Sequence, residues 1–390
     1  MREPRHEPPP PPRQPPLALA FSGGGFRASL GALGVLRFLA EAGLLAQVRW
    51  VSSVSGGSVA NGVFAASYED LGAAGFTPDA LEEHVVQPFV ERIGETSMAE
   101  AMVRSIWRVV GRKTRTDLLA ETLDEWFLGG RLLENISPNC RFIFNAANLT
   151  TGVRFGFERD VFGDYVLGLR ETAGSGLRLA QAVAASAAFP GAFAAVDLGR
   201  FTFPCSKGRT ASLLDGGAYD NMGLEPVDDL NHRDHPEELR DACLVVMNAG
   251  GVFQTGAYGR LPLVRDLQRT NSLLYRQSVV LRTRAMVERF QAWERAPDGE
   301  RPPWARRGVL FGLATTMPAG TAEEWRERRP EPSKKFIAEL AKTETSFNRF
   351  PQHLCDRLLY RGWWLAGATL SQYHRELLPA DLPFRPDPDA

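Results

Sequence analysis

The chain has 390 residues, of which 44% are hydrophobic and 23% charged, and its formal net charge is −1. This composition is typical of a globular protein with room for one large or two medium domains, and the near-neutral charge excludes a strongly basic surface, so we expect no nucleic-acid partner. The four cysteines stand far apart without a C-x-x-C pair, which excludes a disulfide framework and a structural zinc site; we expect no metal and no cofactor.

The first 16 residues, MREPRHEPPPPPRQPP, predict a disordered proline-rich tail in extended conformation. They lack the apolar segment of a secretory signal. The alanine-rich stretch at residues 179–196 is too weakly apolar to span a membrane and is interrupted by Pro190. We therefore expect a cytoplasmic protein that touches membranes only peripherally.

Two strand–turn–helix units follow the tail. Residues 17–21 form an apolar run that ends at the glycines of residues 22–25, and apolar residues then recur at helical spacing. Residues 48–54 are rich in β-branched side chains and end at the turn Ser55-Gly56-Gly57-Ser58, with a second helix behind it. This order predicts parallel strands joined by right-handed crossovers.

The remaining elements predict a single α/β domain over residues 17–378. Residues 78–128 have a helical pattern and are expected to form an insertion or cap, and residues 379–390 a C-terminal tail. Further strands are expected at residues 141–147, 153–158, 211–215, 243–248 and 309–314, a long arginine-rich helix at about 262–295, and terminal helices to about 377.

The first glycine turn could bind either a phosphate or an oxyanion. Gly23, Gly25 and Ala28 match G-x-G-x-x-G/A, and both ligands would use backbone amides at a helix N-terminus. A dinucleotide site also needs a carboxylate at the end of the second strand, where this chain has Ser53-Val54-Ser55. The sequence therefore favours an oxyanion.

Ser55 lies on a turn close to G-x-S-x-G, with Ser53 in place of the first glycine. Asp215 ends another apolar strand and is also followed by two glycines, whereas none of the six histidines has such a position. A carboxylate at the same edge of the sheet could take the proton of Ser55 directly, which predicts a Ser-Asp dyad. Two plainer roles remain open, a helix N-cap for Ser55 and a turn-forming side chain for Asp215.

Four motifs resemble those of the patatin-like phospholipases, a family that includes the catalytic domain of cytosolic phospholipase A2. They occur in the family's order as SGGGFRA at 22–28, SVSGGS at 53–58, AASAAFPGAF at 184–193 and DGGAYDNMG at 215–223, and the resemblance covers residues 17–250. It implies a three-layer α/β/α fold with a mostly parallel central sheet.

The same resemblance implies roles for particular residues. Ser55 and Asp215 would form the catalytic dyad of a phospholipase A-type lipid acyl hydrolase, and the amides of Gly23, Gly24, Gly25 and Gly56 its oxyanion hole. Arg27 matches the arginine after the family's glycines and is expected to bind the substrate phosphate or to hold the loop.

The implied partners are a phospholipid or another acyl-ester lipid, a transient membrane surface, and a regulatory partner or ligand of unknown identity. Two other functions remain open at this point. One is a Ser-His-Asp carboxylesterase or thioesterase, and the other is a non-catalytic module that binds lipid or nucleotide.

Two further patterns allow a lipid-related and a plain interpretation. Residues 260–307 contain eleven arginines and five acidic residues, which would suit anionic headgroups or simply a solvated helix face. The aromatic residues at 76, 89, 107, 126 and 127 could form a membrane-facing lid or acyl channel, or belong to the core.

Overall fold

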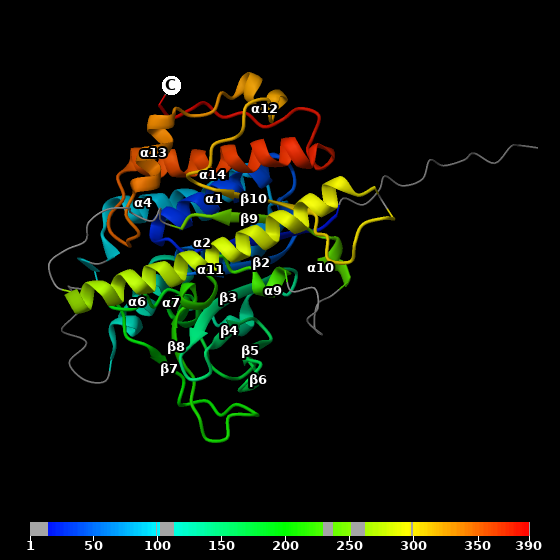
Figure 1. Ribbon diagram of the computed structural model, residues 1–390. Helices are drawn as coiled ribbons and strands as arrows, with labels where there is room; N and C mark the ends of the chain where they lie inside the picture. The colour runs from blue at the N-terminus through cyan, green and yellow to red at the C-terminus, as the bar shows by residue number, and fades with distance from the viewer. Residues whose placement is uncertain are drawn as a thin grey trace, which may run out of the picture.

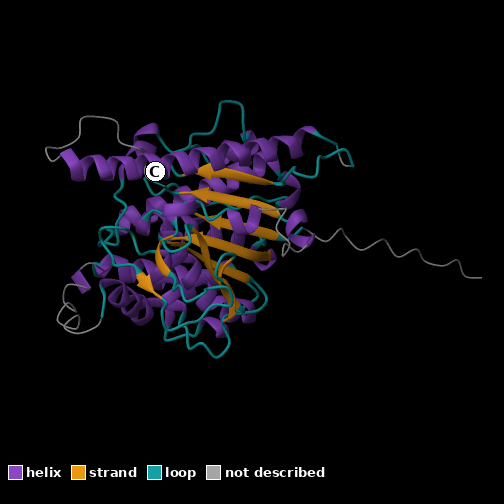
Figure 2. Cartoon of the chain, turned by 60° about the horizontal axis from the view of Figure 1, so that its bottom comes forward, coloured by secondary structure: helices purple, strands orange, loops and turns teal. Residues whose placement is uncertain are grey.

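The computed structural model describes residues 15–98, 100–101, 113–228, 237–250, 262–297 and 299–389. A central mixed sheet runs through this part of the chain in the order β10-β9-β1-β2-β3-β4-β5-β6, and β8 and β7 join it beside β3. Figure 2 shows the strands lying between helices on both faces. The predicted three-layer α/β/α class is confirmed.

The first half of the sheet is parallel. It comprises β10 (Gly308–Gly312), β9 (Cys243–Asn248), β1 (Leu17–Phe21), β2 (Val48–Val54) and β3 (Arg141–Asn148). Every residue of β1 is buried, because helices cover both faces of the sheet at this point. This explains why these strands are apolar without alternation.

The second half is antiparallel. It comprises β4 (Val153–Phe157), β5 (Val161–Asp164) and β6 (Gly168–Glu171), and β8 (Ser212–Asp215) pairs with both β3 and β7 (Val196–Asp197). The strands β5, β6 and β7 were not predicted. They are short, and β5 and β6 contain glycine, so they lack a hydrophobic pattern long enough to recognise.

Strand β3 brings β2 and β8 end to end. One edge of β3 is taken by β4 at residues 144–148, so β2 and β8 must share the other edge. Val54 pairs with Asn145, and Asp215 pairs with Ala146, the next residue of β3. Since β8 runs opposite to β2, the carboxyl ends of the two strands meet.

Helices on the two faces bury separate hydrophobic clusters. On one face lie α1 (Gly25–Glu41), α2 (Gly56–Ala73) and α14 (Gln352–Tyr373); on the other lie α9 (Glu225–Asp228), α10 (Glu237–Asp241) and α11 (Pro262–Arg295), the long yellow helix of Figure 1. The remaining elements are α3 (Pro78–Leu81), α4 (Gln87–Glu95), α6 (Arg115–Leu123), α7 (Leu179–Ser186), α8 (Gly217–Asp220), α12 (Glu323–Arg328), α13 (Lys334–Lys342), η1 (Leu45–Gln47), η2 (Glu82–Val86), η4 (Asp124–Leu128), η5 (Leu133–Asn135) and η6 (Arg375–Leu377).

Helices α1 and α14 cross at glycines. An alanine at position 362 would place its Cβ 2.1 Å from the carbonyl oxygen of Gly31, and one at position 34 would place it 2.2 Å from that of Leu359. Only glycine allows two backbones to approach so closely. This crossing therefore fixes the position of α1, whose first turn forms part of the candidate site.

The aromatic residues described in the 78–128 segment and just before it belong to the core. Phe89 is fully buried and stacks on Phe127 with ring centroids 4.9 Å apart, while Phe76 and Trp126 pack against the same core. For these residues the idea of a membrane-facing lid is therefore wrong. Trp107 lies outside the described residues, as do His6 and most of the proline-rich tail.

The C-terminal residues pack on the body of the protein. Arg385 forms ion pairs with Glu41 of α1 and Glu82 of η2, and Arg329 donates to the carbonyls of Leu382 and Pro383. In the described part of the chain, no helix combines the length and the hydropathy needed to cross a bilayer.

Candidate active site

Ser55 occupies a sharp turn between β2 and α2. Its φ of 52° and ψ of −121° are strained for a residue with a side chain. A Cβ at Gly56 would lie 2.0 Å from the carbonyl oxygen of Gly25, and one at Gly57 would lie 2.6 Å from that of Phe21. The glycines after Ser55 are thus required by close backbone contact.

The serine at position 53 fits the turn although glycine is usual there. Its hydroxyl lies 2.9 Å from that of Ser58 and 3.2 Å from the carbonyl oxygen of Ile143, and it accepts a hydrogen bond of 2.8 Å from Asn61 Nδ2. The side chain is completely buried in this small polar network. The departure from the usual pattern is therefore accommodated by neighbouring polar groups.

Asp215 meets Ser55 from the end of β8. Asp215 is only 2% exposed, and its carboxyl group accepts a 2.8 Å hydrogen bond from the amide of Gly217. Burial raises the pKa of Asp215 to about 6, because a charged carboxylate loses its solvation, and the neighbouring Ser55 side chain and the Gly217 amide partly oppose this shift. The carboxylate can therefore act as a base near neutral pH.

The last residue of α7 and the segment that follows it are hydrogen-bonded to both turns. The amide of Ser55 donates to Ser186 Oγ at 3.1 Å, and that hydroxyl donates to the carbonyl of Asn145. The amide of Gly216 donates to the carbonyl of Ser186, and that of Asp215 to the carbonyl of Ala188. The sequence analysis gave this alanine-rich segment no role at the site; the lone serine before Pro190-Gly191 was the available signal.

The glycine loop lies against Ser55, and its amides differ in whether they already have a hydrogen-bond partner. Gly23 donates its N–H to the carbonyl of Asn221 at 3.0 Å, so that amide is engaged. Gly24 and Gly25 have φ values of 148° and 60°, which favour glycine. Among the described residues, the amides of Gly24, Gly25 and Gly56 have no hydrogen-bond partner, as expected at the starts of α1 and α2.

Arg27 holds the loop and does not face an open cleft. It is 3% exposed, and its Nε and Nη2 atoms donate to the carbonyl of Ala249 at 3.0 and 2.8 Å. Further bonds reach the Thr343 carbonyl and the Thr345 hydroxyl. With its donors used in this way, Arg27 fits the loop-holding role, and the expected contact with substrate phosphate is not supported.

Two polar side chains that sequence reasoning did not assign lie close to the dyad. Asn221 places Oδ1 2.4 Å from the position of a Cβ at Gly23 and 2.7 Å from one at Gly217. Tyr275 of α11 also contacts Gly217. Asn221 belongs to the DGGAYDNMG motif, whereas Tyr275 carried no sequence signal.

The described histidines lie away from the dyad. His84 and His353 are exposed, and buried His374 contacts the carbonyl of Gly308. His232 and His235 fall outside the described residues. Within the described part of the chain no cluster of His, Cys, Asp or Glu suits a metal ion.

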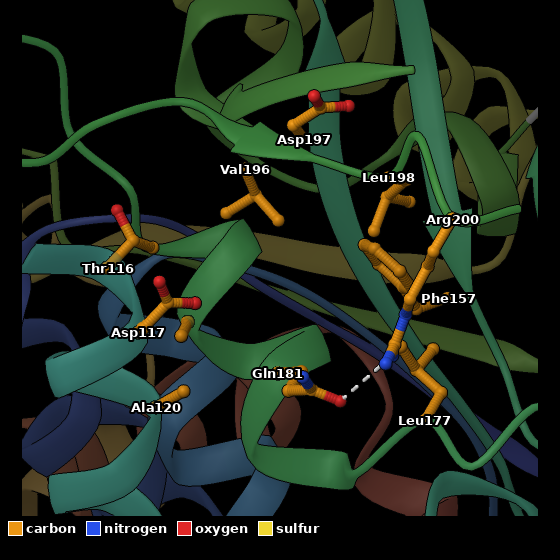
Figure 3. A pocket seen from close by; sticks show the side chains of 11 residues that line it. Thr116, Asp117, Ala120, Phe157, Leu177, Gln181, Val196, Asp197, Leu198 and Arg200 are labelled. Atoms are coloured by element: carbon orange, nitrogen blue, oxygen red, sulfur yellow. Dashed lines mark hydrogen bonds between the residues drawn. The ribbon is translucent and has the colours of Figure 1, made fainter. Parts of the chain in front are cut away.

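A pocket of about 220 Å³ lies among α6, α7 and β7, separate from the dyad. In Figure 3 the Arg200 side chain reaches toward Gln181, 3.5 Å away, while Thr116 and Asp117 line the other side. Ser55 and Asp215 are not among its lining residues.

Comparison with known families decides the class of the protein. The model of the family described as patatin-like phospholipase matches residues 19–228, a range that contains all four motifs. The chain belongs to the patatin-like phospholipase family. Membership in this family implies lipid acyl hydrolase activity on a lipid ester, and the resemblance drawn from the motifs is confirmed.

Solved structures share the fold of this patatin-like chain. Human GIVD cytosolic phospholipase A2 matches with a TM-score of 0.51 at 12% identity, covering 90% of this chain and 60% of that one. The same human enzyme in complex with methyl gamma-linolenyl fluorophosphonate and terbium chloride gives 0.47 at 13% identity, covering 90% and 57%. The chain thus spans about 60% of the length of the human enzyme. A search of curated proteins found no match.

Proposed function

We propose that this patatin-like protein is a phospholipase A-type hydrolase that cleaves fatty acyl esters of membrane lipids with a Ser55–Asp215 dyad. The observation that carries the proposal is that β2 and β8 end at adjacent residues of β3, which brings the Ser55 side chain beside the buried carboxyl group of Asp215, whose pKa is raised to about 6. A serine hydroxyl needs a base to become a nucleophile, and this carboxylate is in place to act as one.

In the first half of the reaction, Asp215 accepts the Ser55 proton while Oγ attacks the ester carbonyl. The charge that develops on the carbonyl oxygen would be stabilised by the amides of Gly24, Gly25 and Gly56, which start two helices and have no partner among the described residues. Gly23 would shape the loop and would not donate, since its amide is already bonded to Asn221.

In the second half, the proton on Asp215 passes to the departing alcohol or lysolipid, leaving Ser55 acylated. Water activated by Asp215 then releases the fatty acid and restores the hydroxyl. The proposed cycle uses no metal or cofactor. Because the substrate resides in a bilayer, we also propose transient contact with a membrane surface.

The test is a lipid-hydrolysis screen by mass spectrometry with the native protein, Ser55→Ala and Ser67→Ala. Ser67 lies on the same helix, and its hydroxyl donates to the carbonyl of His84, away from the dyad. We expect free fatty acid and lysolipid from the native protein and from Ser67→Ala, and none from Ser55→Ala. Equal release by the Ser55 variant, with thermal unfolding unchanged, would overturn the proposal.

A further inference from the structure

Helix α11 lies beside the segment that follows Asp215 and is fixed there by several contacts. Ser278 Oγ donates to the carbonyl of Tyr219 at 3.2 Å, Thr283 Oγ1 to Met222 Sδ at 3.5 Å, and Arg289 Nη1 to Asp228 Oδ1 at 2.9 Å. These contacts fix the rotation of the helix against α8 and α9. Tyr275, three residues before Ser278, is therefore held on the same side.

The ring of Tyr275 lies over Gly217, two residues after the proposed base. Tyr275 Cε1 is 2.8 Å, and Asp215 Oδ1 is 3.0 Å, from the position that a Cβ at Gly217 would occupy. The two atoms are thus within 5.8 Å of each other, the sum of those distances. Glycine at position 217 leaves the space that the ring fills.

The phenol oxygen of Tyr275 is a buried polar atom. It is inaccessible to solvent and has no hydrogen-bond partner in the described part of the chain. Burial and the charge of Asp215 both raise the pKa of Tyr275, so the hydroxyl keeps its proton. An unsatisfied buried hydroxyl is costly and rare, and one beside a general base points to a ligand atom that completes it.

We propose that Tyr275 is a catalytic residue whose hydroxyl donates a hydrogen bond to the leaving-group oxygen of the bound ester. The inference rests on the proposed function. In the proposed reaction, the amides of the glycine loop donate hydrogen bonds to the carbonyl oxygen of the substrate. The leaving oxygen must face Asp215 to receive a proton. Tyr275 lies on the Asp215 side.

The step balances without any further reactant. As the bond between the acyl carbon and the leaving oxygen breaks, its electron pair stays on that oxygen. Asp215 delivers to this oxygen the proton that it took from Ser55, and Tyr275 keeps its own proton while its hydrogen bond stabilises the developing negative charge. The products are acylated Ser55, the free alcohol and the ionised carboxylate of Asp215.

The test compares Tyr275→Phe with Tyr219→Phe on two esters of the same fatty acid. Tyr219 is the matched control, because its side chain interacts with Glu225 and its ring lies 5.6 Å from the Arg282 guanidinium. A glycerol ester has a strongly basic leaving oxygen that needs a hydrogen bond, whereas a nitrophenyl ester has a weakly basic one that does not.

We expect Tyr275→Phe to lower kcat/KM about tenfold on the glycerol ester and to leave the nitrophenyl ester nearly unchanged, with Tyr219→Phe unaffected on both. Equal losses on both esters would indicate a structural role, and no loss on either would indicate a hydroxyl satisfied by water; each result overturns the inference. Labelling of Ser55 by a fluorophosphonate separates the two proposals, because its absence in the native protein would contradict the dyad itself.

Discussion

The first turn of helix α1 and the middle of the same helix both depend on glycine, with different consequences. In the middle, Gly34 of α1 and Gly362 of α14 let the two helices approach, and the contact is backbone against backbone in a fully buried core. In the first turn, Gly24 and Gly25 adopt positive φ, and their amides have no hydrogen-bond partner among the residues that the structure describes. The same residue type allows close helix packing in one place and forms the proposed oxyanion hole in the other.

Three groups of the candidate site are energetically unfavourable in the folded protein, and they lie close together. Ser55 has a strained backbone, Asp215 is buried with a raised pKa, and the hydroxyl of Tyr275 is buried with no partner among the described residues. None of these features stabilises the fold, whereas the α1–α14 crossing does. Unfavourable interactions are therefore concentrated where the proposed chemistry needs them.

The largest effect on activity is expected for Asp215→Asn, which removes the proposed base. Lipid hydrolysis should fall by on the order of ten-thousandfold. The free energy of unfolding of this variant should, in contrast, rise above pH 6. The pKa of Asp215 is raised from 3.8 to about 6 on folding, so the ionised carboxylate opposes folding by on the order of 3 kcal/mol above pH 6, and this penalty fades as the pH falls toward 4.

Asp220→Asn is the matched control for that prediction. The Asp220 carboxylate accepts hydrogen bonds from the amides of Met222, Leu224 and Glu225, so its loss should destabilise the fold while the folded enzyme keeps most of its activity. Thermal unfolding at pH 7 and pH 4 and hydrolysis assays measure both variants. If Asp215→Asn were less stable than the native protein at pH 7, the inference that the ionised Asp215 carboxylate destabilises the fold would be wrong.

A smaller loss is expected for Gly23→Ala. The added methyl group would lie 2.4 Å from Asn221 Oδ1 and 3.2 Å from Ser55 Cβ, so it must displace groups beside the nucleophile. Misplacement of a reacting group by about an ångström can cost on the order of a hundredfold in rate. Steady-state hydrolysis should show this loss with little change in the unfolding temperature, and unchanged kcat would show that the loop does not shape the site.

The opposite pattern is expected for Gly362→Ala at the helix crossing. Its Cβ would meet the Gly31 carbonyl at 2.1 Å, and overpacking of this kind costs about 1–3 kcal/mol of stability. Thermal unfolding should show the loss, while kcat/KM of the folded protein stays near the native value. A Gly362→Ala variant with the native unfolding temperature but a low rate of lipid hydrolysis would contradict the claim that glycines at the helix crossing affect stability and not activity.

Sequence patterns predicted what depends on local backbone geometry. The strand ends at Val54 and Asp215, the glycines that follow them, and the family were all recognisable, because tight turns demand small residues at fixed spacing. The same patterns could not predict the direction of β8. Along one edge of β3, β2 is parallel and β8 is antiparallel, and for this reason their carboxyl ends meet. They also could not give contacts between distant segments, such as Ser186 with Ser55, Arg27 with Ala249, and Tyr275 with Gly217.

The most direct test of the account is the pH dependence of Ser55 labelling by a fluorophosphonate, followed by peptide mass spectrometry. Since only the ionised carboxylate of Asp215 can take the serine proton, the labelling rate should be constant above pH about 6 and fall as the pH drops below it. The adduct should lie on Ser55, and Asp215→Asn should abolish the pH-dependent reaction. Labelling at another residue, or the same pH profile in Asp215→Asn, would contradict the proposed dyad.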